Sequence, residues 1–324
     1  MYTQLLQVRN LVVYYATRHG VVKAVDGMSF HVGKGEKVCL IGESGSGKST
    51  VALSIMKLLP KNATVEGEII FEGINLLNLS EDDMRKIRGS EISMVFQDPL
   101  TALNPLLTIG LQCSEPYEEH LKISRREAMT KAIDMLKKVK IPSAEIAIRR
   151  YPHTFSGGMR QRSLIAMMLS LKPKLIVADE PFSALDVSLQ VGVMQLLNEL
   201  IKDSGASLLL ITHDLGVAAE MCDRVVVMYA GKLLEESDVF NIFDNPKHPY
   251  TQGLLSSLPT PDKILKKSEL PMMRGLPPSL VNPPPGCRFH PRCPFATEKC
   301  SREEPPLVEI DRGHKVACWL QKGV

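Results

Sequence analysis

A glycine-rich stretch, GESGSGKST at residues 42–50, carries the clearest chemistry in the sequence. It fits the pattern G-x-x-x-x-G-K-[ST], in which backbone amides curl around a phosphate and a following helix directs its positive end to the same point. We expect Lys48 to bridge the β- and γ-phosphates of a nucleotide and the Ser49 hydroxyl to ligate Mg²⁺. The predicted phosphate-binding residues are Gly42, Ser44, Gly45, Ser46, Gly47, Lys48, Ser49 and Thr50.

An acidic pair ends the apolar run of KLIVADEP, residues 174–181. Asp179 is placed to hold Mg²⁺ through its water shell, as the acidic partner of a phosphate loop does. Glu180 is placed to accept a proton from the attacking water. A solvated acidic pair at the end of a strand is the alternative interpretation, and the phosphate loop upstream disfavours it.

A second candidate anion site lies in YPHTFSGGMRQR, residues 151–162. Ser156, Gly157 and Gly158 precede an apolar run and predict a helix N-terminus with exposed backbone amides. One chain does not need two phosphate sites for one nucleotide. We therefore infer that this second site covers a nucleotide held by a partner subunit.

The elements that position these residues follow from the hydrophobic pattern. KLIVADE and SLLLITHD are short continuous apolar runs, which are typical of parallel strands buried on both faces. Other predicted strands are VVKAVDGMSFHV, KVCLIGE, a pair around the glycine turn of VEGEIIFEGINLL, and EISMVFQ ending at Gln97. VALSIMKLL predicts a helix that stops at Pro60, residues 106–170 read as mainly helical, and RVVVMYAGKLLEE predicts a hairpin turning at Gly231. The pattern predicts an α/β fold.

Composition excludes several classes of protein. At 324 residues and 44% hydrophobic, the chain can bury the core of one domain and a substantial appendage. The net charge of +3 is spread over mixed basic and acidic residues, which disfavours nucleic-acid binding. The sequence has no apolar run of membrane-spanning length and no signal peptide, so we expect a cytosolic chain. Cys39, Cys113 and Cys222 are predicted to be buried as small apolar residues.

The motif order GESGSGKST, VFQDP, FSGGMRQR, LIVADEP, SALD and ITHD resembles the ATP-binding subunit of ABC transporters over roughly residues 5–245. The resemblance implies a P-loop NTPase core with an antiparallel β subdomain and a helical subdomain at about 99–165. It further implies that two subunits close head to tail over two ATP molecules. On this basis we expect an ABC nucleotide-binding domain at 1–245 and a C-terminal extension at 246–324.

The resemblance also implies roles for single residues. Tyr15 matches the aromatic side chain that stacks on adenine, with Tyr14 the less favoured choice. Gln97 matches the loop that senses Mg²⁺ and the membrane partner, and His213 matches the histidine at the γ-phosphate. The remaining matches are Ser156, Gly157 and Gly158 at the partner's γ-phosphate and Asp186 between the two sites. Phe182 departs from the small polar residue common in the family, and we interpret it as a packing change.

The extension is rich in proline and contains Cys287, Cys293, Cys300 and Cys318, spaced C-x₅-C-x₆-C-x₁₇-C. These gaps do not fit the paired C-x₂₋₄-C of common zinc sites. Disulfides are disfavoured in the cytosol, and an iron–sulfur cluster needs four sulfurs but no fixed spacing. His290 and His314 are nearby alternative ligands for zinc. Spacing alone therefore leaves a cluster, zinc and no metal open.

HPYTQGLLSSLP followed by GCRFHPRCPFATEKC and a late cysteine resembles the C-terminal extension of oligopeptide/dipeptide importer ATPases, the dipeptide D component above all. The resemblance implies that the four cysteines are ligands of a [4Fe–4S] cluster, which would staple a loop-rich extension. A structural role is favoured over electron transfer, and redox sensing is the alternative.

We therefore expect an ATPase that energises import of di- or oligopeptides, bound at the cytoplasmic face of the membrane. Its expected partners are a second ATPase subunit, identical or related, two membrane-spanning subunits and an extracytoplasmic binding protein. An importer for nickel or another small solute is one alternative. A soluble ABC ATPase of DNA repair or translation is another, and the lack of a coiled-coil insertion, a second cassette and strong positive charge disfavours it.

Overall fold

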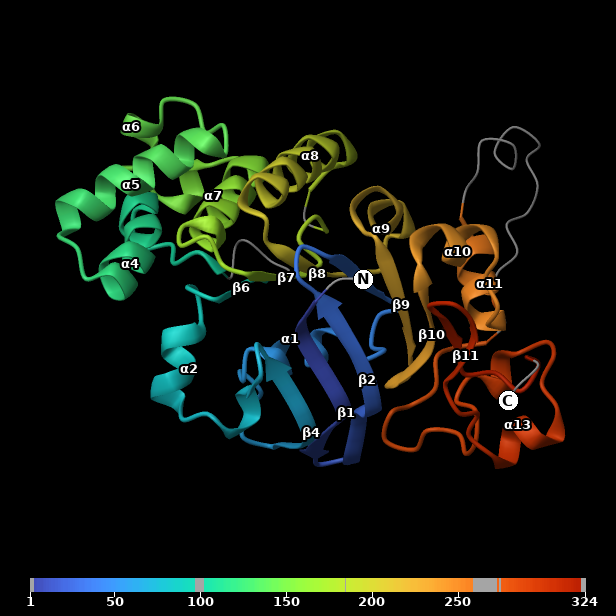
Figure 1. Cartoon of the computed structure of the whole chain (residues 1–324). Helices are drawn as coiled ribbons and strands as arrows, with labels where there is room; N and C mark the ends of the chain where they lie inside the picture. The colour runs from blue at the N-terminus through green and yellow to red at the C-terminus, as the bar shows by residue number, and fades with distance from the viewer. Residues whose placement is uncertain (1–2, 97–101, 184, 259–272, 274, 322–324) are drawn as a thin grey trace. The chain divides into compact units, whose positions relative to one another are not determined.

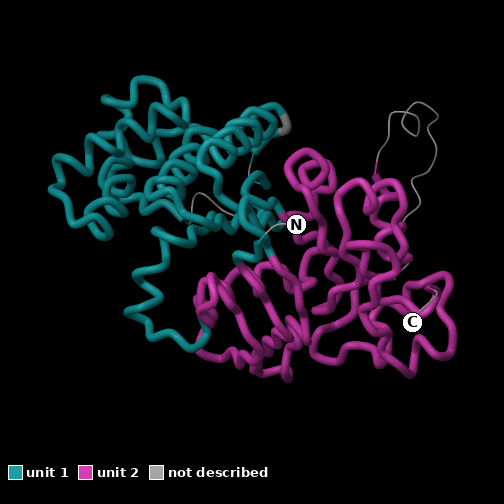
Figure 2. Tube along the Cα trace, in the orientation of Figure 1, with its two compact units in different colours: residues 1–5, 32–37, 76–211 teal, residues 6–31, 38–75, 212–324 magenta. Residues whose placement is uncertain are grey.

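The computed structural model describes residues 3–96, 102–183, 185–258, 273 and 275–321 (Figure 1). The chain divides into two compact units, coloured separately in Figure 2. Unit 1 comprises Met1–Leu5, Val32–Lys37 and Leu76–Ile211, and unit 2 comprises Leu6–His31, Val38–Asn75 and Thr212–Val324. The C-terminal extension therefore belongs to the same unit as the phosphate loop.

An antiparallel sheet forms one part of unit 2, in the order β2-β1-β4-β5. Its strands are β1 (Gln4–Thr17), β2 (Gly20–Gly33), β4 (Ala63–Phe71) and β5 (Ile74–Asn75). β1 and β4 pair from Leu6 opposite Phe71 to Tyr15 opposite Ala63, with an irregularity between Arg9 and Val12. The predicted glycine turn between β4 and β5 is confirmed, and β4 pairs antiparallel with both β1 and β5.

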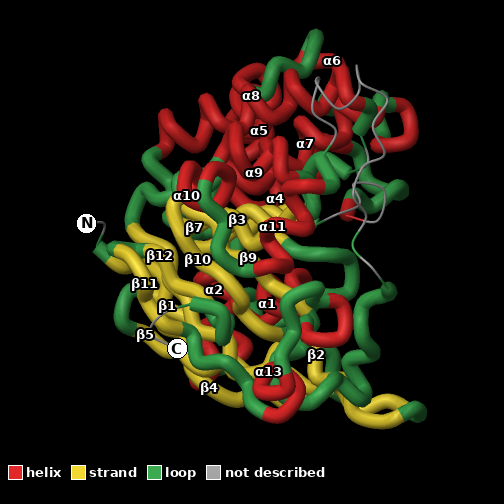
Figure 3. The backbone as a smooth tube through the Cα atoms, turned by 90° about the vertical axis from the view of Figure 1, so that its right-hand side faces the viewer, coloured by secondary structure: helices red, strands yellow, loops and turns green. Residues whose placement is uncertain are grey.

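The second group of strands in unit 2 has the order β11-β12-β10-β9-β3. These strands are β3 (Lys37–Ile41), β9 (Arg224–Tyr229), β10 (Lys232–Asp238), β11 (Val308–Asp311) and β12 (His314–Val316). β3 runs parallel to β9, and β9 and β10 form the predicted hairpin with Gly231 at its turn. β12 pairs with β10, so the extension adds two strands to this sheet (Figure 3).

Short helices complete unit 2. They are α1 (Lys48–Ile55), α9 (Leu215–Met221), α10 (Val239–Asp244), α11 (Pro249–Ser256), α13 (Glu298–Arg302) and the 3₁₀ helix η3 (His290–Arg292). The helix predicted to run to Pro60 ends at Ile55 instead. Lys57 adopts a left-handed φ of 51° and the Leu58 amide donates to the Leu53 carbonyl, which closes the helix before the proline.

Unit 1 contains a parallel sheet of β6 (Ile92–Val95), β7 (Leu175–Asp179) and β8 (Ser207–Thr212). β7 and β8 are buried along their whole length, as their continuous apolar sequences predict. The strand predicted to end at Gln97 ends at Val95, and Gln97 lies outside the described residues.

The remaining elements of unit 1 are helical and confirm the prediction for residues 106–170. They are η1 (Leu76–Asn78), α2 (Glu81–Ile87), α4 (Ile109–Leu121), α5 (Arg125–Lys138), α6 (Ala144–Ala147), η2 (Pro152–Thr154), α7 (Gly157–Leu169) and α8 (Val187–Ser204). Ser124 and Glu127 form a capping box at the start of α5. The buried side of α5 carries Ala128, Ala132, Met135 and Leu136, an i, i+4, i+7, i+8 stripe.

The predicted burial of the three cysteines outside the extension is confirmed. Cys39, Cys113 and Cys222 are buried, at 0%, 2% and 7% exposure. No helix in the part of the chain that the structure describes combines the length and apolar character that a bilayer span requires.

Candidate functional site

The phosphate loop links β3 to α1 in unit 2, and its glycines are required by close backbone approaches. A Cβ atom at Gly42 would lie 2.1 Å from the Met228 carbonyl oxygen, and one at Gly47 would lie 2.0 Å from that of Ala24. Gly47 also has a φ of 106°, a left-handed value that side chains rarely tolerate. The loop is therefore packed against its own unit at both ends, which leaves its amides in a defined arrangement.

Lys48 begins α1 and is buried, with its ammonium group directed back over the loop. Its Nζ donates to the carbonyl oxygens of Gly42 at 2.8 Å and Glu43 at 2.9 Å. Ser49, by contrast, is exposed. A cation held above a glycine-rich loop at the start of a helix is the arrangement that binds phosphate groups.

The adjacent Tyr14 and Tyr15 point to different partners. The Tyr15 hydroxyl donates to Thr50 Oγ1 at 3.2 Å, which places this side chain against α1. The Tyr14 hydroxyl donates to Asp26 Oδ1 at 2.7 Å, and burial together with this bond raises the pKa of Tyr14 to about 12. The Tyr15 hydroxyl therefore bonds to the segment that carries the predicted phosphate-binding residues, whereas the Tyr14 hydroxyl bonds to β2.

In unit 1, β7 delivers the acidic pair. Asp179 is the last residue of the strand and is buried, and Glu180 follows with a φ of 45°. The Glu180 amide donates to the Ile211 carbonyl oxygen at 2.8 Å, which holds this left-handed residue at the end of β8. Such a conformation costs about 1–3 kcal/mol for a residue with a side chain and is concentrated at functional sites. Phe182 is buried, as expected of a packing residue.

Two helix N-termini in unit 1 carry further predicted site residues. Ser156 caps α7 by accepting a hydrogen bond from the Met159 amide at 3.3 Å, and Gly157 and Gly158 form the first turn. The predicted helix start at this motif is confirmed. Asp186 caps α8 by accepting from the Leu189 amide at 3.0 Å, and hydrogen bonds led by the one from Ser188 lower the pKa of its carboxyl group.

His213 directly follows β8 and is exposed, one residue before α9 begins at its cap Asp214. The predicted residues therefore fall into two groups. Unit 2 holds the phosphate loop, Tyr15 and His213, and unit 1 holds Asp179, Glu180, Asp186 and the Ser156–Gly158 turn.

Comparison with known proteins gives matches over both the cassette and the extension. A family model described as ABC transporter matches residues 25–183, and one described as oligopeptide/dipeptide transporter, C-terminal region, matches residues 234–300. The probable peptide ABC transporter ATP-binding protein y4tR of Sinorhizobium fredii is 48% identical over 99% of this chain and 96% of its own length. The chain belongs to the ATP-binding subunits of oligopeptide/dipeptide ABC transporters.

Other similar proteins agree. The oligopeptide transport ATP-binding protein AppD of Bacillus subtilis is 47% identical over 98% of this chain and 96% of that protein. Among solved structures, the dimeric post-hydrolysis ATP-binding cassette MJ0796 bound to ADP and phosphate matches with a TM-score of 0.65 and 30% identity, covering 72% of this chain and 98% of that one. This ABC subunit therefore has the fold of an ABC ATPase and hydrolyses ATP.

The four cysteines of the ABC subunit's extension line one small cavity in unit 2, together with Phe289 and Trp319. All four are free thiols, and burial raises the pKa of Cys287 to about 11 and also raises the pKa values of Cys293 and Cys318. Among the described residues, no group of three or more His, Cys, Asp and Glu side chains could hold a metal ion. The cysteines are therefore gathered around one point without forming an ion site.

Both histidines named as alternative zinc ligands bond a protein oxygen through one ring nitrogen, and His290 lines the cavity of the four cysteines. His314 Nε2 lies 2.7 Å from Glu235 Oε1 and is buried, and His290 Nδ1 lies 2.9 Å from the Cys287 carbonyl oxygen. A ligating histidine commonly bonds a protein oxygen through its second ring nitrogen, so these bonds do not decide between zinc and no metal.

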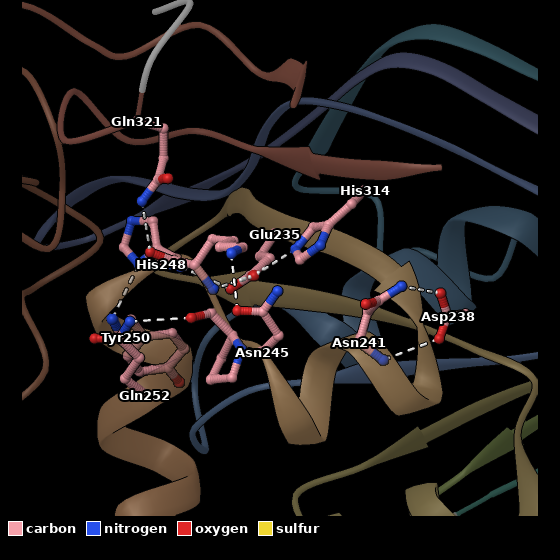
Figure 4. Close-up of polar contacts among 11 residues, drawn as sticks. Glu235, Asp238, Asn241, Asn245, His248, Tyr250, Gln252, His314 and Gln321 are labelled. Atoms are coloured by element: carbon pink, nitrogen blue, oxygen red, sulfur yellow. Dashed lines mark hydrogen bonds and ion pairs between the residues drawn. The ribbon is translucent and has the colours of Figure 1, made fainter. Parts of the chain in front are cut away.

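A buried polar cluster, which the sequence did not reveal, anchors the extension of the ABC subunit to β10 (Figure 4). Glu235 is fully buried and accepts hydrogen bonds from the Lys247 amide at 2.6 Å, the His248 amide at 2.9 Å and His314. His248 Nδ1 in turn accepts from the Tyr250 amide at 3.0 Å and caps α11. The only sequence signal was His248-Pro249, a cap followed by proline at the first helical position.

Proposed function

We propose that this ABC ATPase energises the import of di- or oligopeptides through a membrane transporter. The observation that carries the proposal is the match of residues 234–300 to the oligopeptide/dipeptide C-terminal region, because this segment lies outside the nucleotide-binding motifs. The relatives whose names specify oligopeptide or dipeptide transport match over nearly their whole length, which supports the same cargo class.

The chemistry proposed for the site is positioning and charge neutralisation. Lys48 and the loop amides would bind the β- and γ-phosphates, with Tyr15 against adenine. Ser49, Asp179 and Gln97 would hold Mg²⁺, while Glu180 and His213 would place and polarise the attacking water. Ser156, Gly157 and Gly158 would complete the γ-phosphate site of a partner subunit, with Asp186 between the two sites.

The proposed partners follow from that arrangement. A second ATPase subunit, the same or related, would supply the opposite half of each nucleotide site, and two membrane-spanning subunits would receive the closing motion. An extracytoplasmic binding protein would select the peptide. We place this subunit at the cytoplasmic face of the membrane, with a nucleotide-binding domain at 1–245, its helical subdomain at about 99–165, and an extension at 246–324.

Uptake by cells tests the cargo. Cells whose own copy of this chain carries Lys48→Ala should lose uptake of radiolabelled peptides of two to five residues, because the loop would no longer bind ATP productively. Uptake of an unrelated amino acid and of radioactive nickel serves as the control. Loss of nickel uptake with peptide uptake unchanged would contradict the proposal and favour the small-solute alternative.

We further propose that Cys287, Cys293, Cys300 and Cys318 bind a [4Fe–4S] cluster. The support is the donor set, since four thiols line one cavity and iron–sulfur clusters are held by cysteine thiolates. The cluster would supply a covalent crosslink among loop segments. Binding it would require Cys287, Cys293 and Cys318 to lose their protons, against the burial that raises the pKa of each of these thiols.

Metal analysis tests this assignment. Protein purified without oxygen should contain iron and acid-labile sulfide in equal amounts, and Cys287→Ser should lose both, since it removes one of the four ligands. Cys113→Ser is the matched control, because Cys113 is a buried thiol of the other unit. Zinc in place of iron, or no metal in the anaerobic protein, would refute the cluster.

A further inference from the structure

The C-terminal extension contacts the phosphate loop through an arginine, within unit 2. Arg292, the last residue of η3, donates from Nη1 to Glu43 Oε2 at 2.7 Å and from Nη2 to Glu43 Oε1 at 3.0 Å. Glu43 is the second residue of the loop sequence GESGSGKST. The two side chains are only 6% and 21% exposed, so this forked ion pair is largely shielded from water.

A second residue of the extension holds the backbone of Glu43. The Glu43 amide donates to the Tyr250 hydroxyl at 2.9 Å, and Tyr250 lies fully buried on α11. Arg292 also donates to the Tyr229 hydroxyl at 3.2 Å, and its guanidinium lies 5.7 Å from the centre of that ring. Tyr229, Tyr250 and Phe289 pack against one another with ring centres 4.6 to 5.4 Å apart. Both contacts to Glu43 therefore come from side chains that belong to this aromatic cluster or bond to it.

The backbone carbonyl of Glu43 bonds to Lys48, the lysine of the phosphate loop. That carbonyl oxygen accepts from Lys48 Nζ, so the amide, carboxylate and carbonyl of one loop residue are each held in place. The same segment of the extension has a second link. Arg288 donates to Asp26 and to the Ala230 carbonyl, and the adjacent Gly231 amide donates to the Ser46 carbonyl of the loop at 2.9 Å.

The negative charge of Glu43 gives the contact with Arg292 an electrostatic role as well as a structural one. A carboxylate within a loop that binds phosphate anions would repel them, and the repulsion is strong where water is scarce. The forked arginine neutralises that carboxylate and, by bonding both of its oxygens, fixes the Glu43 side chain in one conformation. Arginine suits this task better than lysine, because its planar group bonds both oxygens at once.

We propose that Arg292 and Tyr250 are positioning residues for the nucleotide site, holding Glu43 so that the phosphate loop is preorganised and its carboxylate is neutralised when MgATP binds. This inference rests on the proposed role of the phosphate loop, and it adds a structural connection from the extension to that loop. Arg292 directly precedes Cys293 in the sequence, so the position of Arg292 depends on the conformation of the cysteine-containing segment.

Nucleotide affinity of the purified full-length chain tests the proposal, with a fluorescent ATP analogue and Mg²⁺ as the probe. Arg292→Met should raise Kd about 10- to 100-fold, the range for losing a charged hydrogen-bonded partner. The Kd of Arg292→Lys should lie between that of Arg292→Met and that of the natural chain. KM for ATP should rise with kcat changed less than about threefold, because the reacting groups are untouched. Arg302→Met is the matched control, since Arg302 is an exposed arginine of the same extension paired with Glu298.

A double-mutant cycle separates charge neutralisation from general loss of structure. Glu43→Gln alone should raise Kd less than Arg292→Met does, because it removes the repelling charge and its amide oxygen still accepts from Arg292. Adding it to Arg292→Met should restore most of the lost affinity, because no uncompensated carboxylate remains. No restoration would overturn the charge argument. If Arg292→Met fails to fold, Tyr250→Phe replaces it, and a Kd within twofold of the natural value would overturn the positioning role.

Lys48→Ala distinguishes failure of this inference from failure of the site itself. If Lys48→Ala abolishes binding while Arg292→Met binds as the natural chain does, only the positioning role is refuted. If Lys48→Ala binds normally, the phosphate-loop assignment is refuted and this inference with it.

Discussion

A chain carrying Glu180→Gln should bind MgATP with nearly unchanged affinity and hydrolyse it about 10²- to 10⁴-fold more slowly, the usual effect of removing a general base. The amide keeps the size and hydrogen-bonding reach of the carboxylate but cannot take a proton from water. Glu180 is the residue to test because it adopts a left-handed φ of 45° immediately after a buried strand. A conformation of that kind persists only where the surroundings impose it.

Single-turnover hydrolysis and equilibrium nucleotide binding together make the measurement. The matched control is Glu199→Gln, an exposed glutamate of the same unit that pairs with Lys140 at 3.2 Å. It should hydrolyse ATP at the natural rate, because an exposed ion pair contributes little and lies outside the proposed site. A Glu180→Gln chain that keeps more than about a tenth of the natural rate would show that another group activates the water.

The second large effect concerns stability. Glu235→Ala should lower the free energy of unfolding by about 3–5 kcal/mol, because three groups around this buried carboxylate lose their hydrogen-bond acceptor and each such loss costs about 1–3 kcal/mol. The change leaves the Lys247 amide, the His248 amide and His314 without the acceptor that each now uses inside the protein. Because these groups join β10 to both ends of the extension, we expect the extension to detach first.

Urea unfolding followed by Trp319 fluorescence measures this loss, since the chain's single tryptophan lies in the extension. Glu298→Ala is the control, because Glu298 is 75% exposed and its removal should cost less than about 0.5 kcal/mol. Glu235→Gln should have an intermediate effect, because it keeps an acceptor oxygen. Unfolding of Glu235→Ala within about 1 kcal/mol of the natural chain would mean that the cluster does not anchor the extension.

The pH dependence of the same contribution has a defined sign. Burial by itself would raise the pKa of Glu235, but hydrogen bonds from His314, Thr251 and the backbone bring it below its ordinary value of 4.5. The stabilisation is therefore complete above pH 4.5 and is lost as the pH falls through the lower pKa of the folded state. The difference between the natural chain and Glu235→Ala should accordingly shrink only below pH 4.5.

Much of the fold was predictable because its signals are local. Unbroken apolar runs identified β7 and β8, and a serine before two glycines identified the start of α7. The ends of elements were less predictable. α1 ends at Ile55 because Lys57 adopts a left-handed backbone conformation, which no residue in VALSIMKLL predicts.

The sequence by itself determined the phosphate loop, the acidic pair and the order of the motifs, since each is a short stretch whose backbone geometry depends on its own residues. Only the tertiary structure decided which charges are buried and paired. In the sequence, Glu235 looks like the polar end of a hairpin, but in the structure it bonds to His314 from a strand 79 residues later. Glu43 looks like a variable loop position, but in the structure it pairs with Arg292, which lies 249 residues away in the sequence. Contacts between residues so far apart in the sequence depend on how the sheet is assembled. Local sequence does not specify them, because the two side chains meet only in the folded protein.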